Sequence, residues 1–425
     1  MRKFLLLLLF PITLFSQGYT SYFTGNTTNI TTSPEYGVCM MGGATEHDNA
    51  MIWLLEKANG GDVVVLRSSG SNGYNDYLYS ELGVNVNSVE TLVITSVAGA
   101  TSPYVLDKVA NAELIWFAGG DQYNYVSYFK DNALEDLLNN HINVKLAPIG
   151  GTSAGLAILG GKYFSAQNGS VTSAEALANP FNPYMTIGFD DFLHVPLLED
   201  VITDSHYDDP DRRGRHTAFL ARIRQLYINT KGIACNEYVA VCFGLDGLAY
   251  VYGDYPNYEE FAYFIQDNCN NNGDIETLQP NTPLTWDFAG KALQVYKVPG
   301  TMNGTHHFDL NNWESGSVSG GSWEYWSAVD GVMNFSAGIA PNCVLSTDEF
   351  SGLEMQVIPI PFNDFIQLSN AENADIKVFD IVGKCVIHIT DYNGSEINTT
   401  SLDSGIYIMT AEVDGKTIPK KVVKN

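Results

Sequence analysis

Short apolar runs alternate with amphipathic stretches over the first 150 residues of the chain. The run at 37–43 ends in two glycines, and the apolar positions that follow it, Met51, Leu54 and Leu55, recur at helical spacing. This pattern predicts a strand that leads into a helix. Strands separated by helices imply an α/β fold with a mostly parallel sheet and helices on both of its faces. The same alternation predicts further strands at 62–66, 89–94, 113–117 and 144–149 and a helix at 122–138.

Two of the predicted strands end in glycine-rich segments. Residues 118–122 read Ala-Gly-Gly-Asp-Gln, and residues 150–155 read Gly-Gly-Thr-Ser-Ala-Gly. In open α/β sheets, ligands bind outside the carboxyl ends of the strands. We therefore expect the functional site at these two segments.

The first 16 residues have the pattern of a secretory signal peptide. Two basic residues precede an apolar run at 4–15, which is too short to span a bilayer because a spanning helix needs about 20 residues. Cleavage is expected to leave a mature chain that begins near Gln17. No later segment approaches the length of a membrane span, so none is expected.

The segment at 354–425 changes character to short alternating strands, predicted at 376–379, 385–389 and 406–412. Such a pattern is typical of a small all-β sandwich. Combined with its motifs, the segment resembles the C-terminal sorting domain of the type IX (Por) secretion system. The resemblance implies export through the periplasm of a Gram-negative, Bacteroidetes-type cell to the medium or the cell surface, with the type IX machinery as a partner. The motifs are PIPF at 359–362, VFDIVGK at 378–384, LDSGIY at 402–407 and a basic end at 420–424.

Acidic residues outnumber basic ones by 48 to 22, which gives a formal net charge of −26. This charge repels phosphate backbones and anionic lipid head groups, so nucleic acid is excluded as an expected partner. Apolar residues make up 45% of the chain, which is a globular composition.

Ser153 lies in a frame of small residues at 151–155, directly after a predicted buried strand. This frame is typical of a nucleophile elbow, in which small neighbours allow a sharp turn and leave the serine Oγ exposed. The amide of Ala154, with an amide from Gly119 or Gly120, is expected to form an oxyanion hole. A turn that only caps a helix is the alternative interpretation.

A serine nucleophile needs a base, and His206 is our candidate among the eight histidines. It ends a predicted strand in the run Asp-Ser-His-Tyr at 204–207 and precedes a polar loop. A purely structural histidine is the alternative. The remaining candidates, which lack these flanks, are His194, His216, His306 and His307.

Three motifs in this order resemble the cyanophycinase branch of the peptidase E serine peptidases. They are Gly-Gly-Asp-Gln at 119–122, Gly-Gly-Thr-Ser-Ala-Gly at 150–155, and the run at 204–207 followed by Arg-Arg-Gly-Arg at 212–215. The resemblance implies a flavodoxin-like fold, related to class I glutamine amidotransferases, within a peptidase domain at 17–345. It also implies Ser153 as the nucleophile and His206 as the base.

In the family, an acidic residue after the nucleophile helix and before the histidine orients the imidazole. Glu175 is our candidate for this third member. Asp190, Asp191 and Glu199 remain alternatives.

The resemblance implies a site for cyanophycin, a poly-aspartate that carries arginine on each β-carboxyl. Arginine forks bind carboxylates in bidentate fashion, so Arg212 and Arg215 are expected to contact substrate, whereas Arg213 is equally suited to a surface ion pair. Ser205 replaces the Gln usual before the histidine, so another β-aspartyl or acidic peptide stays open as the substrate. No metal or organic cofactor is expected, and a homodimer is expected by resemblance. The full expected substrate set is Asp121, Gln122, Asp204, Ser205, Arg212 and Arg215.

The expected function is therefore that of a secreted serine peptidase, which hydrolyses β-aspartyl (cyanophycin-like) or related acidic peptide bonds through an acyl-enzyme. The alternative is a secreted, non-catalytic polymer-binding protein that retains the fold and uses an aromatic-rich segment at about 280–340. Packing of a terminal β subdomain is our preferred interpretation of that segment. A glutaminase-like amidotransferase is disfavoured because the elbow holds Ser153 rather than a cysteine.

Six cysteines in an exported chain can form disulfides, but their spacing does not decide whether any pair is bonded. Cys39 lies in a predicted strand and is expected to be a buried core residue. Pairing of Cys235 with Cys242 stays open.

Overall fold

The computed structural model describes residues 17–227, 231–271, 275–343, 356–359, 361–369, 373–380, 384–413 and 416–425. The expected signal peptide at 1–16 lies outside the described residues. The chain divides between Cys343 and Val344 into two compact units.

The first unit contains a ten-stranded sheet in the order β1-β4-β3-β5-β6-β2-β11-β12-β15-β16 within the described residues. Neighbours from β4 to β2 are parallel, and all other neighbours are antiparallel. The expectation of a mostly parallel sheet thus holds only for the central five strands, and the fold is mixed α/β. The strands are β1 (Tyr19–Gly25), β2 (Val38–Met41), β3 (Asp62–Arg67), β4 (Ser88–Ile94), β5 (Leu114–Phe117), β6 (Ile149–Thr152), β11 (Ala240–Phe243), β12 (Leu248–Tyr252), β15 (His306–Asp309) and β16 (Val318–Ser319).

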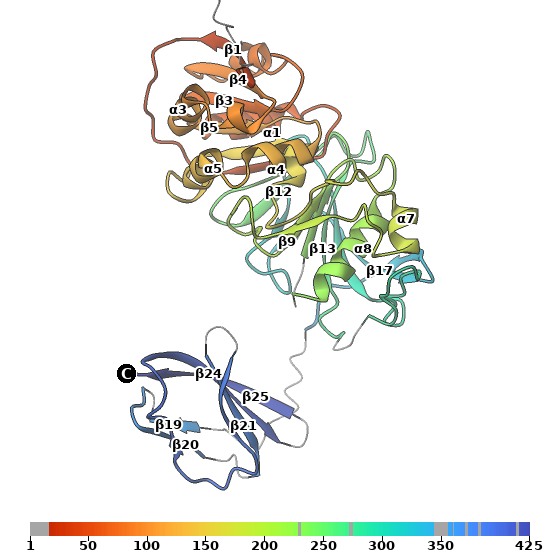
Figure 1. Ribbon diagram of the computed structural model, residues 1–425. Coiled ribbons are helices and arrows are strands. Elements are labelled where there is room, and N and C mark those ends of the chain that lie inside the picture. The colour runs from red at the N-terminus through yellow and green to blue at the C-terminus, as the bar shows by residue number, and fades with distance from the viewer. Residues whose placement is uncertain are drawn as a thin grey trace, which may run out of the picture. The chain divides into compact units, whose positions relative to one another are not determined.

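Alternate residues of the parallel strands point to opposite faces of this sheet, and both faces are covered. Val64 and Leu66 of β3 belong to one buried cluster with α3 and α5, whereas Val63 and Val65 belong to another with α1. Figure 1 shows these helices beside the strands. The helices of this region are α1 (Asp48–Glu56), a π-helix (Tyr77–Glu81), α2 (Val97–Ala100), α3 (Pro103–Asn111), α4 (Gln122–Phe129), α5 (Ala133–Asn143) and α6 (Ala154–Ala157).

Two predicted elements differ from the structure. The helix predicted at 122–138 is two helices, because Asp131 has φ +60° and Asn132 caps α5 through the amide of Leu134. The strand predicted at 144–149 begins only at Ile149. Val144 instead follows α5 with 72% of its side chain exposed, and Leu146 has φ +50°, which a strand does not allow.

A second sheet of eight strands in the described residues has the order β18-β17-β14-β13-β10-β9-β7-β8. Strand β9 is parallel to both β10 and β7. One face of this sheet packs against Phe219 and Ile223 of α8. On the other face, Ile233 and Phe264 of the sheet pack toward the first sheet. The elements are β7 (Lys162–Phe164), α7 (Ser173–Ala178), β8 (Ile187–Phe189), β9 (Val201–Asp204), α8 (Arg213–Arg224), β10 (Lys231–Cys235), β13 (Phe261–Asp267), β14 (Leu293–Pro299), β17 (Ser322–Val329) and β18 (Val332–Ala337).

The aromatic-rich segment at 280–340 is not a separate subdomain. It supplies β14, β17 and β18 to the second sheet and β15 and β16 to the first. Trp286 and Trp326 are fully buried and Trp313 nearly so, which agrees with packing and not with an exposed polymer-binding surface.

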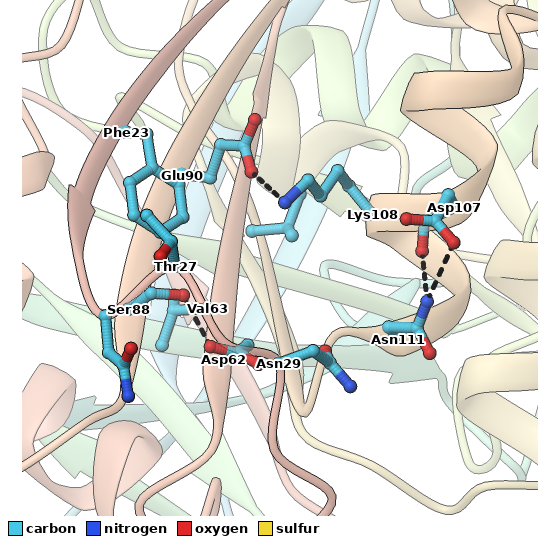
Figure 2. A pocket seen from close by; sticks show the side chains of 12 residues that line it. Phe23, Thr27, Asn29, Asp62, Val63, Ser88, Glu90, Asp107, Lys108 and Asn111 are labelled. Atoms are coloured by element: carbon cyan, nitrogen blue, oxygen red, sulfur yellow. Dashed lines mark hydrogen bonds and ion pairs between the residues drawn. The ribbon is translucent and has the colours of Figure 1, made fainter.

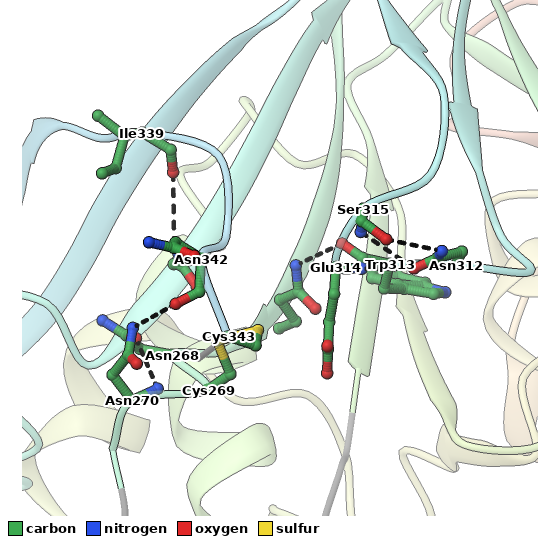
Figure 3. The surroundings of a disulfide bond; sticks show 12 residues. Asn268, Cys269, Asn270, Asn312, Trp313, Glu314, Ser315, Ile339, Asn342 and Cys343 are labelled. Carbon is green, nitrogen blue, oxygen red and sulfur yellow. Dashed lines mark hydrogen bonds between the residues drawn. A yellow bond between two sulfur atoms is a disulfide. The ribbon is translucent and has the colours of Figure 1, made fainter. Parts of the chain in front are cut away.

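A disulfide joins Cys269, after β13, to Cys343, the last residue of the first unit (Figure 3). Cys39, Cys235 and Cys242 are free and buried, so the open pairing of Cys235 with Cys242 does not occur. Cys39 is a core residue, as expected.

The second unit is all-β, with sheets in the order β19-β20-β23 and β22-β21-β24-β25. Ile366, Ile376 and Met409 contribute to its own buried core. The three strands predicted here correspond to β21, β22 and β24. The strands are β19 (Gln356–Ile358), β20 (Phe365–Ser369), β21 (Asp375–Phe379), β22 (Cys385–Ile389), β23 (Ile397–Asn398), β24 (Gly405–Val413) and β25 (Lys416–Lys424). Among the residues described in both units, no helix has the length and apolar character needed to cross a membrane.

Candidate active site

Ser153 lies on a sharp, strained turn between β6 and α6. Its φ of 54° and ψ of −112° lie outside the regions that L-residues usually occupy. Only small neighbours fit around this turn: a Cβ on Gly151 would lie 2.6 Å from the backbone of Gly155, and one on Gly155 would lie 2.3 Å from the carbonyl of Phe117. The geometry matches the elbow expected from the frame at 151–155.

A chain of two hydrogen bonds leads away from the Ser153 hydroxyl. Its Oγ lies 2.8 Å from Nε2 of His206, and Nδ1 of His206 lies 2.5 Å from Oε1 of Glu237. The serine comes from the first sheet, whereas the histidine and the glutamate follow β9 and β10 of the second. Because β9 and β10 are parallel neighbours, with Ala234 opposite Asp204, the residues just beyond their ends lie side by side.

The expectation that Glu175 orients His206 is wrong. Its carboxylate instead forms a capping box at the start of α7, where it accepts hydrogen bonds from the amide and hydroxyl of Thr172. Those bonds, both to Oε2, lower the pKa of Glu175 and hold its carboxylate at the surface. The alternatives are no better placed, since Asp190 pairs with Lys162 and Asp191 with Lys130. The last alternative is Glu199, whose backbone packs against Gly161.

The imidazole and its carboxylate are held by the glycine pair at the end of β2. The amide of His206 donates to the carbonyl of Gly42, and the amide of Tyr238 donates to the carbonyl of Gly43. Gly43 also packs against the imidazole, because a Cβ there would lie 2.4 Å from Cε1 of His206. On the other side, Asp208 accepts from the amide of Glu237 at 2.9 Å. His206 itself has φ 46°, so its backbone is strained as well.

The loop after β5 lies against the Ser153 side chain. A Cβ on Gly119 would lie 3.5 Å from the Cβ of Ser153, so the loop after β5 contacts the nucleophile directly. Within the described residues, no hydrogen bond from the amide of Gly119, Gly120 or Ala154 to another protein group is seen. These three amides are the expected oxyanion donors, and they are free to bind a ligand.

A pocket of about 370 Å³ opens beside Ser153 and His206. Asp204 and Arg215 form one wall, where the guanidinium donates to both carboxylate oxygens, at 2.8 and 2.5 Å. Burial alone would raise the pKa of Asp204, but the charge and hydrogen bonds of Arg215 outweigh it and hold the pKa below its usual value. Arg215 lines the pocket with two of its nitrogens bound by Asp204, and its contact with substrate stays a prediction.

Arg212 is the pocket arginine with donor capacity left. Its Nη1 donates to the carbonyl of Ser205 at 2.9 Å, and its buried Nε has no hydrogen-bond partner among the described groups. Asp204 lies 3.8 Å away but is already bound by Arg215. Burial and the charge of Arg215 lower the pKa of Arg212. The pocket thus carries an incompletely paired cation.

The other expected contact residues vary in position. Asp121 and Gln122 line the pocket, but Asp121 caps α4 and the Gln122 amide donates to the carbonyl of Phe164. Ser205 also lines the pocket, with its amide bound by Asp204. Arg213 lies outside it, paired with Asp211 on the surface.

The remaining candidate histidines contact groups away from Ser153. His216 is buried with Nε2 on the carbonyl of Ile202, and His306 contacts the carbonyl of Pro299. His307 contacts Ser317 and Ser319, and His194 is exposed.

Two further features of the described residues carry no comparable chemistry. No group of three or more His, Cys, Asp or Glu side chains there could hold a metal ion. A small pocket of about 60 Å³ lies between β1, β3, β4 and α3 (Figure 2). Its carboxylates are engaged: Ser88 donates to Asp62, and Lys108 pairs with Glu90 at 3.1 Å.

The second unit has a recognised counterpart. Residues 356–425 match the family model of the secretion system C-terminal sorting domain. This confirms the sorting domain expected from the tail motifs and indicates export to the medium or the cell surface by the type IX system. The secretion machinery is therefore a partner of this unit.

Similarity elsewhere is distant. A crystal structure of a peptidase from an acI-B1 Actinobacterium is 14% identical, with a TM-score of 0.39, and the match covers 52% of this chain and 89% of that one. PorZ, a surface component of the type IX secretion system of Porphyromonas gingivalis, is 13% identical over 43% of this chain and 29% of its own, with a TM-score of 0.16. At these scores neither likeness bears on function. No curated protein matches the sequence.

Proposed function

We propose that the first unit is a serine hydrolase that cleaves an amide bond through an acyl-enzyme. The observation that carries the proposal is the chain of hydrogen bonds from Ser153 through His206 to Glu237. A hydroxyl becomes a nucleophile when a base accepts its proton, and the base works best when a carboxylate fixes its tautomer. The strained turn at Ser153 and the free amides beside it add to this support.

The proposed reaction has two halves. The Oγ of Ser153 attacks the scissile carbonyl carbon as its proton passes to Nε2 of His206. The amides of Ala154 and of Gly119 or Gly120 bind the resulting oxyanion. His206 then donates the proton to the departing amine, the C–N bond breaks, and the ester remains. In the second half, water attacks the ester with His206 again as the base, which gives a free carboxylic acid and restores the serine.

The substrate class follows from the pocket together with the motif resemblance. The guanidinium of Arg212 lines the pocket, and its side chain is about one fifth exposed, so it suits a carboxylate next to the scissile bond. A β-aspartyl amide carries such a carboxylate, as in cyanophycin or a related acidic peptide. The chemistry proposed uses only protein groups, so no metal or organic cofactor takes part. The homodimer and the cyanophycinase assignment stay predictions.

Two assays on the mature chain test the proposal. The first is covalent labelling of Ser153 by a fluorophosphonate, located by peptide mass spectrometry, with Ser153→Ala as control. The second is digestion of insoluble cyanophycin, in which cleavage of the β-aspartyl amide releases arginine and cleavage of the backbone amide releases soluble Asp-Arg dipeptide. Labelling at Ser153 and release by the wild type alone are expected. An unlabelled wild type would overturn the serine mechanism and favour a binding protein, whereas labelling without release would reject only cyanophycin.

A further inference from the structure

A buried threonine connects the strand that leads to His206 with the helical turn that follows Ser153. The hydroxyl of Thr203, on β9, donates a hydrogen bond to the carbonyl of Leu156, on α6, at 3.0 Å. Thr203 lies three residues before His206, and Leu156 lies three residues after Ser153. This bond therefore joins the two segments a second time, in addition to the 2.8 Å contact between Ser153 Oγ and His206 Nε2.

The hydroxyl of Thr203 lies on a face of β9 that is packed in the core. Successive residues of a strand point to opposite faces, so Thr203 shares its face with Val201. Val201 belongs to the buried cluster between the two sheets, whereas Ile202 packs with α8 on the other face. Thr203 is only 1% exposed, and a valine would fill a similar space. Its hydroxyl is thus a buried polar group that needs a partner, and the carbonyl of Leu156 is that partner.

The turn that carries Ser153 depends on its surroundings because α6 is short. It contains only four residues, Ala154–Ala157, and a single helical turn is not stable by itself. The φ of 54° at Ser153 adds strain, which persists only where the surrounding structure fixes the backbone. The bond from Thr203 supplies such a constraint near the far end of the turn.

Backbone bonds to β2 hold the same two segments at the reacting residues. The amide of Ser153 donates to the carbonyl of Met41 at 3.0 Å, and the amide of His206 donates to the carbonyl of the next residue, Gly42, at 2.8 Å. These bonds fix the backbone of the nucleophile and of the base, but they do not act on the end of α6. The hydroxyl of Thr203 does, and it comes from β9, which lies between β10 and β7 inside the second sheet.

We propose that Thr203 is a positioning residue whose hydroxyl fixes α6 against β9 and so sets the approach of Ser153 Oγ to His206 Nε2. This inference rests on the proposed serine hydrolase function. Its consequence is kinetic, because α6 also carries the amide of Ala154 that is expected to bind the oxyanion. A displacement of reacting groups by about 1 Å can cost roughly 10²-fold in rate. Loss of the bond should therefore slow attack by Ser153 more than it weakens the binding of a ligand.

The experiment measures fluorophosphonate inactivation of the mature chain as two constants, the maximal inactivation rate and the probe concentration at half that rate. Thr203→Val keeps the shape of the side chain and suits a strand, but it removes the hydroxyl. It should lower the maximal rate by about 10- to 100-fold and leave the half-saturating concentration nearly unchanged. Thr203→Ser keeps the hydroxyl and should stay close to the wild type.

Thr91 provides a matched control in the same unit. It is fully buried on β4, and its hydroxyl donates to Oδ1 of Asn75 at 2.6 Å. Strands β3 and β5 separate β4 from β6 in the first sheet. Thr91→Val therefore removes a similarly buried hydroxyl bond away from the site, and it should lower the melting temperature without changing the maximal rate. Thr203→Ala is the second variant should Thr203→Val not fold, and it should be at least as slow.

The outcomes separate this inference from the function on which it rests. A wild type that does not label at Ser153 would defeat the proposed function itself. A labelling wild type whose Thr203→Val variant reacts as fast as Thr91→Val would overturn the positioning role alone. The same holds for a Thr203→Ser variant as slow as Thr203→Val, because the hydroxyl would then not be the cause. Since Thr203 also lines the pocket, a raised half-saturating concentration at an unchanged maximal rate would make it a ligand contact and reject the positioning role.

Discussion

Nδ1 of His206 lies 2.5 Å from Oε1 of Glu237, a residue 31 positions later in the chain. The pairing of β9 with β10 brings the two together, because the carboxyl ends of parallel neighbours meet at one edge of a sheet. Both side chains are about one quarter exposed, so the pair is not buried in the core, and His206 lines the pocket. The carboxylate is placed to fix the tautomer that leaves Nε2 free to accept the proton of Ser153.

Glu237→Gln should lower turnover by roughly 10²- to 10⁴-fold, because an amide can donate to Nδ1 and so stabilise the tautomer that cannot accept a proton at Nε2. Steady-state hydrolysis at saturating substrate measures the effect. Glu175→Gln is the control, and since its amide oxygen can still cap α7, it should leave turnover unchanged. Loss of activity in Glu175→Gln with retention in Glu237→Gln would reverse our assignment.

Gly43→Ala should abolish most activity while the chain still folds. The added methyl would lie 2.4 Å from the His206 ring, and φ at this position is +123°, which L-residues rarely adopt. The ring must then move away from Ser153. Activity and near-ultraviolet circular dichroism are measured together. Gly73→Ala, where a Cβ meets nothing within 4 Å, is the control. Equal activity in both variants would show that the contact with His206 is not needed.

Local patterns in the sequence predict part of this site, and pairing between distant strands accounts for the rest. Ser153 and His206 each follow a strand within a recognisable motif, and the structure brings them to 2.8 Å. Glu237 has no such motif. Its role depends on β10 pairing with β9, which apolar runs alone do not reveal, and the family pattern pointed to an acidic residue before the histidine instead. The signal in the sequence is its position: Glu237 is an acidic residue that closely follows a strand later in the chain than His206.

The same limit applies to the fold. Four of the five parallel strands were predictable because each apolar run is followed by a helical pattern or by glycines, whereas β6 shares only Ile149 with the strand predicted at 144–149. The second sheet was not, because its members come from segments as distant as β7 and β18. Tryptophans such as Trp286 and Trp326 suggested either packing or a binding surface, and only their burial between distant strands decides between them.

Arg212→Gln should raise the KM for a carboxylate-bearing substrate by about 10- to 100-fold, because a charge-assisted hydrogen bond contributes about 1.5–3 kcal/mol. The reason is that Arg212 lines the pocket with a partly exposed side chain, whereas Arg213 is paired with Asp211 outside it. Arg213→Gln is therefore the matched control. Kinetics on a β-aspartyl peptide measure the effect, and an equal KM in both variants would remove Arg212 from substrate recognition.

Loss of the Cys269–Cys343 disulfide should destabilise the first unit. The bond closes a loop with a sequence separation of 74 residues, for which chain entropy predicts roughly 4 kcal/mol of stabilisation. Cys269→Ala/Cys343→Ala should shift the urea midpoint accordingly, and reductant should have no further effect on this variant. Cys385→Ala removes an exposed thiol of the second unit and serves as the control. A midpoint that equals that of Cys385→Ala would contradict the prediction.

Two buried histidines should make the first unit sensitive to mild acid. Burial lowers the pKa of His141 and of His216 from an ordinary value of 6.5 to about 4. Between those values the unfolded chain binds a proton that the folded chain does not, so the contribution of each histidine to the free energy of unfolding falls as pH decreases from 6.5 to about 4 and levels off below. A shift of this size corresponds to at most about 3 kcal/mol per histidine.

Urea unfolding across this range measures the slope. Gln keeps a side-chain donor but does not titrate, so His141→Gln and His216→Gln should each flatten the slope. A slope identical to that of the wild type in both variants would refute the assignment.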